Sequence, residues 1–160
     1  MSLSFKDLLA PVNDLSRPAA LGSWRWLCGR DAVPLLLTAL GDLFVQKNDG
    51  AVYFLDTYEG SLKPAGASYE SWKDELKFQH NLYNWFAPSL LEDLRARGLS
   101  LGEGQCYSPV HPPVMGGTME PDNFEVSSWF VHLQVQGQLH EKLRDLPPGT
   151  PISGIDIEWN

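Results

Sequence analysis

Three short apolar runs follow one another in the first half of the chain, separated by polar turns that end in glycine: residues 43–46, 51–56 and 62–65. The first turn, Lys47-Asn48-Asp49-Gly50, has the composition of a hairpin connection, so the first two runs predict a β-hairpin. The second turn, Tyr58-Glu59-Gly60, leads into the third run, which we expect to be a third strand. An antiparallel sheet is therefore the feature around which the rest of the chain must fold.

Two helices are predicted after this sheet. Ser68 is placed as the N-cap of the first, an amphipathic stretch whose Trp72, Leu76 and Phe78 can face inward. We expect this helix to break or bend around residues 80–84. The second helix has Pro88 in its first turn and ends at Arg95-Ala96-Arg97-Gly98, with cations in the last turn and glycine just beyond it.

The remaining segments carry weaker patterns. Residues 3–9 predict a short opening helix, and residues 35–40 are compatible with either helical turns or a buried strand. The Gly- and Pro-rich residues 102–121 predict an ordered loop, with apolar side chains available to bury it: Tyr107, Val110, Val114 and Met115. Apolar alternation over residues 124–136 predicts a long strand that includes His132, followed by a short helix or turn over 137–146 and a closing strand over 152–159.

Together these elements predict an α+β fold, with a mostly antiparallel sheet covered by helices. The 160 residues suit a single domain, with an N-terminal helix and aromatic segment over 1–33 and the main body over 34–158. Apolar residues make up 43% of the chain, which is enough for a packed core without crosslinks. Cys28 and Cys106 stand far apart and outside any CxxC, as is typical of a reducing compartment, and no membrane span or signal peptide is predicted.

Charge is distributed unevenly along the chain. The formal net charge is −8, and residues 98–160 contribute eight acidic residues against only Lys142 and Arg144. An acidic protein of this kind is a poor nucleic-acid binder, because phosphates are held chiefly by Lys and Arg. If the acids share one face, that face would steer basic partners toward it. The alternative is that they form an ordinary solubilising surface.

Catalytic and metal-binding patterns are weak. Cys106 has no Lys or Arg within eight residues that would lower its pKa, and a cysteine in such surroundings is more often a small buried apolar residue than a nucleophile. His132 and His140 are eight residues apart, a spacing that matches no metal motif. The acids Asp49, Asp56 and Glu59 lack EF-hand spacing. We therefore expect no metal, no cofactor and no enzymatic activity.

Two groups of residues resemble a known family. The first is Gly41-Asp42-Leu43-Phe44 with Gly50 to Thr57 and Gly60; the second comprises the glycine-rich stretch from Leu99 to Gly117, Asn123, Val131-His132-Leu133 and Gly137-Gln138-Leu139-His140. Both resemble the C-terminal domain of Tdi-type immunity proteins, which protect bacteria against type VI secretion DNase effectors. Many members carry a longer N-terminal region resembling a glutamyl-tRNA amidotransferase-associated domain, whereas about 40 residues precede Gly41 here.

The resemblance implies a bacterial cytoplasmic immunity protein that binds a cognate toxin and occludes its basic active site without catalysis. We expect the toxin to be a type VI secretion nuclease. From charge and predicted turn or loop positions, we expect the contact face to comprise Asp56, Glu59, Glu120, Asp122 and Glu125. The glycines, Asn123 and Gln138 of the family pattern are assigned to structure first.

Two other interpretations stay open at this stage. One is a small enzyme or ligand-binding domain with Cys106, Tyr107, His111 and His132 in a pocket beneath the Gly- and Pro-rich loop. The other is an adaptor that binds a non-toxic protein. The sequence leaves the oligomeric state undetermined.

Overall fold

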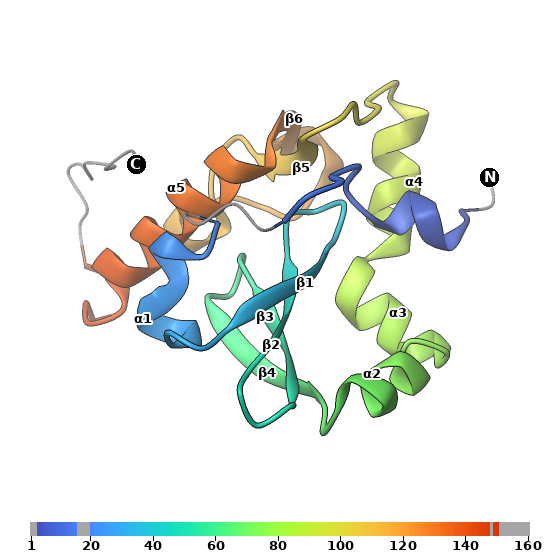
Figure 1. Ribbon diagram of the computed structural model, residues 1–160. Coiled ribbons are helices and arrows are strands. Elements are labelled where there is room, and N and C mark those ends of the chain that lie inside the picture. Colours follow the sequence, from blue (N-terminus) through green and yellow to red (C-terminus); the bar gives the residue numbers. More distant parts are fainter. Residues whose placement is uncertain (1–2, 16–19, 148, 151–160) are drawn as a thin grey trace.

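The fold is known from a computed structural model, which describes residues 3–15, 20–147 and 149–150 (Figure 1). The main sheet has four antiparallel strands in sequential order: β1 (Val33–Leu37), β2 (Leu43–Gln46), β3 (Val52–Asp56) and β4 (Ser61–Gly66). A separate antiparallel ribbon is formed by β5 (Gln105–Pro109) and β6 (Phe124–Ser128). The α+β class with antiparallel sheets in a single domain is therefore confirmed.

Helices cover both faces of the main sheet (Figure 1). The α-helices are α1 (Arg25–Cys28), α2 (Tyr69–Glu75), α3 (Gln79–Phe86), α4 (Pro88–Ala96) and α5 (Trp129–Leu143). Short 3-10 turns are η1 (Phe5–Leu8), η2 (Gly22–Trp24), η3 (Pro113–Met115) and η4 (Pro121–Asn123). Successive strand residues point to opposite faces, so β2 and β3 build two cores at once.

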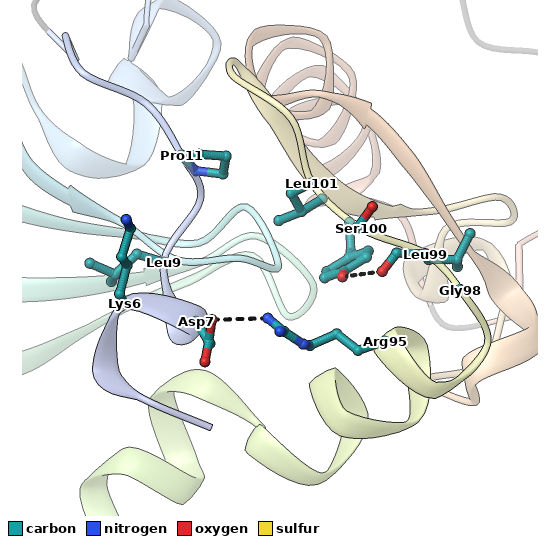
Figure 2. A pocket seen from close by; sticks show the side chains of 10 residues that line it. Lys6, Asp7, Leu9, Pro11, Arg95, Gly98, Leu99, Ser100 and Leu101 are labelled. Atoms are coloured by element: carbon teal, nitrogen blue, oxygen red, sulfur yellow. Dashed lines mark hydrogen bonds and ion pairs between the residues drawn. The ribbon is translucent and has the colours of Figure 1, made fainter. Parts of the chain in front are cut away.

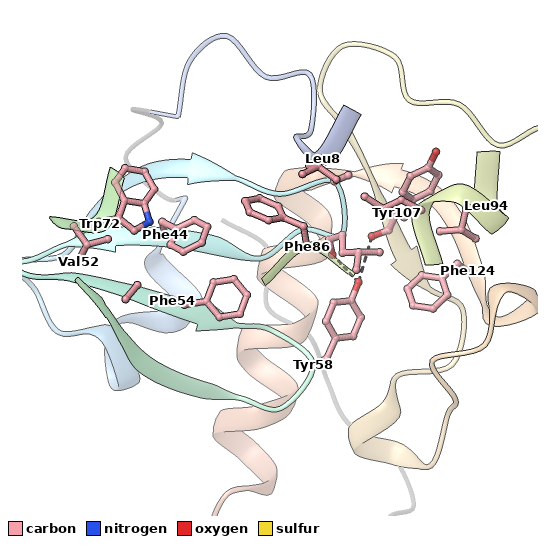
Figure 3. Packing of buried hydrophobic residues seen from close by; sticks show 14 residues of the cluster. Leu8, Phe44, Val52, Phe54, Tyr58, Trp72, Phe86, Leu94, Tyr107 and Phe124 are labelled. Carbon is pink, nitrogen blue, oxygen red and sulfur yellow. Dashed lines mark hydrogen bonds between the residues drawn. The ribbon is translucent and has the colours of Figure 1, made fainter. Parts of the chain in front are cut away.

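One core lies between the sheet and α2–α4. Phe44 packs within it against Trp72 and Phe86, with ring centroids 5.2 Å and 5.9 Å away (Figure 3). Its ring centroid also lies 5.1 Å from that of Trp85. The other core lies on the opposite face, where Leu43, Val45 and Leu55 pack in one cluster with residues of η2, α1 and α5: Trp24, Cys28, Trp129, Phe130 and Leu133. Burial on both faces explains why β2 and β3 are continuous apolar runs without polar alternation.

Several predictions from sequence are confirmed. The hairpin of β2 and β3 and the third strand, β4, are present. Ser68 caps α2, its Oγ accepting a 3.1 Å bond from the Ser71 backbone N–H. Pro88 begins α4, and Gly98 lies just past its end at φ +85°. The segment left open at residues 35–40 contributes to strand β1.

Other predictions are wrong. The long strand over 124–136 ends at Ser128, where the side chain accepts a 3.3 Å bond from the Val131 N–H and starts the 15-residue helix α5. His132 is therefore helical. The helix break falls at residues 76–78, and α3 runs through the predicted break at 80–84. The predicted loop contains strand β5, and the opening helix is only one 3-10 turn, η1. The expected strand over 152–159 lies outside the described residues.

Candidate functional site

The five acidic residues expected to form a contact face lie on two short segments. Asp56 and Glu59 belong to the turn between β3 and β4, while Glu120, Asp122 and Glu125 lie within six residues at η4 and the start of β6. Apart from Asp56, which is half-buried, these side chains belong to exposed residues. The segments are far apart in the sequence, so their relation depends on what packs between them.

A buried aromatic pair joins the two acidic segments. Tyr58 lies between Asp56 and Glu59 in the chain, and Phe124 lies between Asp122 and Glu125; their ring centroids are 6.0 Å apart (Figure 3). The Tyr58 hydroxyl donates a 2.6 Å hydrogen bond to the Leu40 carbonyl, which fixes the turn against the sheet. On each segment, therefore, acidic residues stand on both sides of the aromatic residue that makes this contact.

The acids differ in their local partners. The Asp56 Oδ1 accepts bonds of 2.9 Å and 3.0 Å from the backbone N–H groups of Tyr58 and Glu59, so this carboxylate shapes the turn itself. Glu59 forms an exposed ion pair with Lys63 at 3.0 Å. Along the sequence, no Lys or Arg occurs between Gly98 and Glu141, so the 120–125 segment lacks cations of its own.

A small hollow adjoins the turn. Its volume is about 210 Å³, and it is lined by Glu59 and Gly60 of the turn, Val114 of η3, Trp26, and residues at the end of α5: His140, Leu143 and Arg144. The Arg144 guanidinium lies over the Trp26 ring at 5.1 Å. Glu59 and the loop residue Val114 therefore line the same hollow.

Beneath the acidic turn runs a buried chain of hydrogen bonds. The Asp42 Oδ1 accepts bonds from the Thr57 N–H at 2.8 Å and the Thr57 hydroxyl at 2.7 Å. Because the Thr57 hydroxyl proton goes to Asp42, its oxygen accepts from His132 Nε2–H at 2.9 Å. The other ring nitrogen, Nδ1, then accepts from the Ser108 hydroxyl at 2.8 Å. This chain of hydrogen bonds joins the β1–β2 connection, the β3–β4 turn, α5 and β5.

Burial controls the protonation of this network. His132 is 1% exposed, and the loss of solvation lowers its pKa to about 3, so the ring is neutral near pH 7. Burial also raises the pKa of Asp42 well above its ordinary range, with the nearby charge of Asp56 acting in the same direction. A histidine that is buried, neutral and hydrogen-bonded at both ring nitrogens has the features of a structural residue.

Two glycines of the family pattern make room for two histidines. Gly41 has φ +87°, and a Cβ there would overlap the His132 ring; Gly60 has φ +70°, and a Cβ there would overlap the His140 ring. His140 Nε2 donates a 3.0 Å bond to the Thr57 carbonyl, and burial lowers the pKa of its ring. The motif residues therefore act together in holding α5 against the sheet.

The residues proposed for an alternative catalytic pocket do not share a cavity. Cys106 is fully buried, burial raises its pKa strongly, and His132 is closed within the network described above. His111 is exposed. Tyr107 lines a different cleft of about 450 Å³ between η1 and the end of α4, which is crossed by a 3.0 Å Asp7–Arg95 ion pair (Figure 2). The Tyr107 hydroxyl donates to the Leu99 carbonyl there.

The described part of the chain contains neither a cluster of metal-binding side chains nor a membrane-spanning helix. Over residues 3–15, 20–147 and 149–150, no three His, Cys, Asp or Glu side chains gather as a metal site. Among the helices in these same ranges, none combines the length and apolarity needed to span a bilayer.

Several residues of the buried network and of the surface near the acids were not predicted from the sequence. Thr57 and Ser108 complete the buried network, although hydroxyl residues in a turn and a strand give no signal of this by themselves. Val110 was expected to bury the loop, yet it is 60% exposed, and Met119 beside the acidic segment is 43% exposed. Only the pairing of β5 with β6 shows which side of the loop faces outward.

Comparison with known proteins supports the resemblance. Residues 66–140 match the family model described as T6SS immunity protein Tdi1, C-terminal, a range that lies inside the expected 34–158. The fold is similar to the crystal structure of Atu4351 from Agrobacterium tumefaciens, with a TM-score of 0.52 and 14% identity. That similarity covers 76% of this chain and 63% of the other, so this chain matches less than two thirds of Atu4351. No curated protein matches.

Proposed function

We propose that this chain is an immunity protein that binds and neutralises a cognate type VI secretion effector in the bacterial cytoplasm. The observation that carries the proposal is the match of residues 66–140 to the Tdi1 C-terminal family. The matched range includes α2–α4, both strands of the ribbon and α5 as far as His140, and it contributes Ser108, His132 and His140 to the buried contacts described above. The matched range thus contains one side of these buried contacts, and Asp42 and Thr57 on the other side precede it.

The charge of the chain supports a toxin with a basic surface, and a nuclease is the class we propose. Nuclease active sites and substrate grooves attract phosphate and are rich in Lys and Arg. A protein of net charge −8, with acids on two segments joined by Tyr58 and Phe124, is complementary to such a groove. In this proposal the acidic side chains occlude the groove, and no catalytic step by this chain is needed.

The test is to identify and neutralise the toxin. Secreted effectors of the source bacterium would be expressed one at a time in a sensitive host, with and without this chain. The proposal expects an effector that kills alone, is tolerated together with this chain, and loses nuclease activity in vitro at a 1:1 molar ratio. Protection by a catalytic route, in which this chain cleaves the effector, would contradict it and would appear as effector fragmentation on a gel.

Two results would point to other functions. If this chain binds only non-toxic proteins, the adaptor interpretation gains support. If it protects against an effector without binding it, inhibition by occlusion is excluded. A Thr57→Val variant, which lacks the buried hydroxyl, is not a suitable control here because the loss of its buried hydrogen bonds should lower stability; charge variants at exposed acids are suitable.

A further inference from the structure

The loop between β5 and β6 presents apolar and acidic side chains together. We call the exposed residues of this segment the 110–125 surface: Val110, Met119, Glu120, Asp122 and Glu125. Val110 is 60% and Met119 43% exposed, so both present apolar surface to solvent on the same loop as the acids. A surface that combines exposed apolar groups with charges of one sign is typical of a protein-binding site.

One side chain holds the two ends of this loop together. The Asn123 amide nitrogen donates bonds to the carbonyls of His111 at 2.8 Å and Thr118 at 2.7 Å, and its Oδ1 accepts from the His111 N–H at 3.0 Å. Val110 and Met119 are the chain neighbours of those two bonded residues. Asn123 therefore holds together the two backbone segments that carry Val110 and Met119.

The loop is closed tightly around this amide. A Cβ at Gly117 would overlap the His111 carbonyl, so the two sides of the loop approach as closely as a glycine permits. The Val110 N–H also donates to the Asn123 carbonyl at 2.8 Å, which extends the ribbon pairing by one step. A loop ordered before binding loses little conformational entropy when a partner docks.

We propose that Val110 and Met119 are the apolar anchors of the toxin interface and that Asn123 is the positioning residue that holds them; this rests on the proposed function. Glu120, Asp122 and Glu125 are exposed in the same segment and steer a basic partner toward the anchors. The occupant is the basic surface of the effector, with an apolar side chain seated among its cations. Anchors in the centre of an interface control dissociation, whereas charges at its rim control association.

Charge distinguishes this surface from the other exposed apolar group. Tyr69, Phe78 and Tyr83 are exposed on or between α2 and α3, where two acids of α2 pair with lysines: Glu70 with Lys73 at 3.2 Å and Asp74 with Lys77 at 3.1 Å. A basic partner would meet these lysines. The 110–125 surface has no lysine or arginine in its own segment.

The experiment measures association and dissociation rates with the purified effector identified by the protection assay. Val110→Ala and Met119→Ala should each raise the dissociation rate about 5- to 30-fold and leave the association rate within about twofold. The matched controls Phe78→Ala and Tyr83→Ala also remove exposed apolar side chains and should change neither rate more than about twofold. Thermal melts would check that all four variants remain folded.

Asn123 needs a separate readout, because a general loss of folding would also weaken binding. Asn123→Asp keeps the acceptor for the His111 N–H but loses both amide donors, whereas Asn123→Ala loses all three bonds. Hydrogen exchange at the His111 amide should accelerate in Asn123→Ala and stay slow in Asn123→Asp. The dissociation rate should rise in both, since both release the Thr118 side of the loop.

The outcomes separate this inference from the proposed function. If the effector is neutralised but the Val110 and Met119 variants dissociate at the wild-type rate, the anchors are wrong and the immunity function stands. If these variants change the oligomeric state in size-exclusion chromatography and not the effector kinetics, the surface joins copies of this chain and the inference is overturned. If no effector is neutralised, both proposals fail together.

Discussion

Gly41 lies against the imidazole ring of His132 with no space between them for a side chain. The glycine has φ +87°, a left-handed conformation that L-residues with a Cβ adopt at a cost. Gly41→Ala should therefore add backbone strain of about 1–2 kcal/mol and overpacking of about 1–3 kcal/mol, and so lower the free energy of unfolding by about 2–5 kcal/mol. Urea denaturation measures this directly.

Gly50 supplies the matched control for that substitution. Its φ is +85°, close to that of Gly41, but nothing lies within 4 Å of a Cβ built there. Gly50→Ala should cost only the backbone strain, about 1–2 kcal/mol. Equal losses of unfolding free energy in Gly41→Ala and Gly50→Ala would show that the contact with His132 adds nothing to the cost of the substitution.

The protonation of His132 gives a second prediction. Its pKa is lowered to about 3 in the folded protein, against about 6.5 when unfolded. The unfolded state therefore binds the proton first, and the stabilisation from the neutral ring is fully present above pH 6.5 and lost as the pH falls toward 3. The full difference corresponds to about 4–5 kcal/mol.

Total stability is not the right measurement for this prediction, because Asp42 acts in the opposite direction. Its raised pKa makes the native state hold a proton more tightly, so its contribution weakens as the pH rises above the ordinary carboxyl range. NMR titration of the ring nitrogens reports His132 alone. The expected signals are those of a neutral Nε2–H ring from pH 7 to pH 4.5; conversion to imidazolium near pH 6 would contradict the buried network.

Thr57 links an acid to a histidine through one hydroxyl group. Thr57→Val keeps the shape but removes the acceptor of His132 Nε2–H and one of the donors to Asp42. A buried donor left without a partner costs about 1–3 kcal/mol, so we expect a loss of that size or slightly more. Thr118→Val is the control: its hydroxyl accepts a single exposed bond from Glu120 N–H at 3.3 Å, and the change should stay within about 0.5 kcal/mol. Thermal or urea unfolding compares the pair.

Charge reversal tests the acidic contact face. Lysine at Glu59, Glu120, Asp122 and Glu125 should lower the association rate for the effector and flatten its dependence on salt, because long-range attraction would be lost. Asp56 is better changed to Asn, since its carboxylate accepts two backbone N–H bonds in the turn. Stopped-flow or surface kinetics at several salt concentrations give the slope. Unchanged association after all five substitutions would exclude this face.

The parts of the fold that were predictable have local causes. The β2–β3 hairpin has its turn residues between two apolar runs, and α4 has proline at its start and glycine beyond its end. Such signals depend on a few adjacent residues and not on which distant segments pack against them. Ser68 is of the same kind, since an N-cap needs only the N–H groups that follow it.

Helix α5 was missed for a physical reason. Most of its residues are buried, including polar ones such as Gln134 and Gln136, so it has no polar face opposite an apolar one. A helix covered on nearly all sides has no 3.6-residue pattern, and the alternation around Trp129 looks like a strand. Its N-cap, Ser128, was the one local signal available.

The candidate site was predictable in its charge but not in its assembly. Residues 120–125 are visibly acidic in the sequence, yet the packing of Phe124 on Tyr58 joins segments more than sixty positions apart. The exposure of Val110 likewise depends on its pairing with Asn123. Neither contact has a sequence period that could reveal it.

The hydrogen-bond chain from Asp42 to Ser108 crosses the boundary of the family match. Asp42 and Thr57 precede residue 66, whereas Ser108 and His132 follow it. If recombination exchanged the 66–140 stretch between related proteins, it would join this stretch to residues before 66 that come from a different parent. Only recombinants that preserve the hydroxyl, carboxylate and imidazole partners would inherit a satisfied core, so we expect these four positions to change in concert as such proteins diversify.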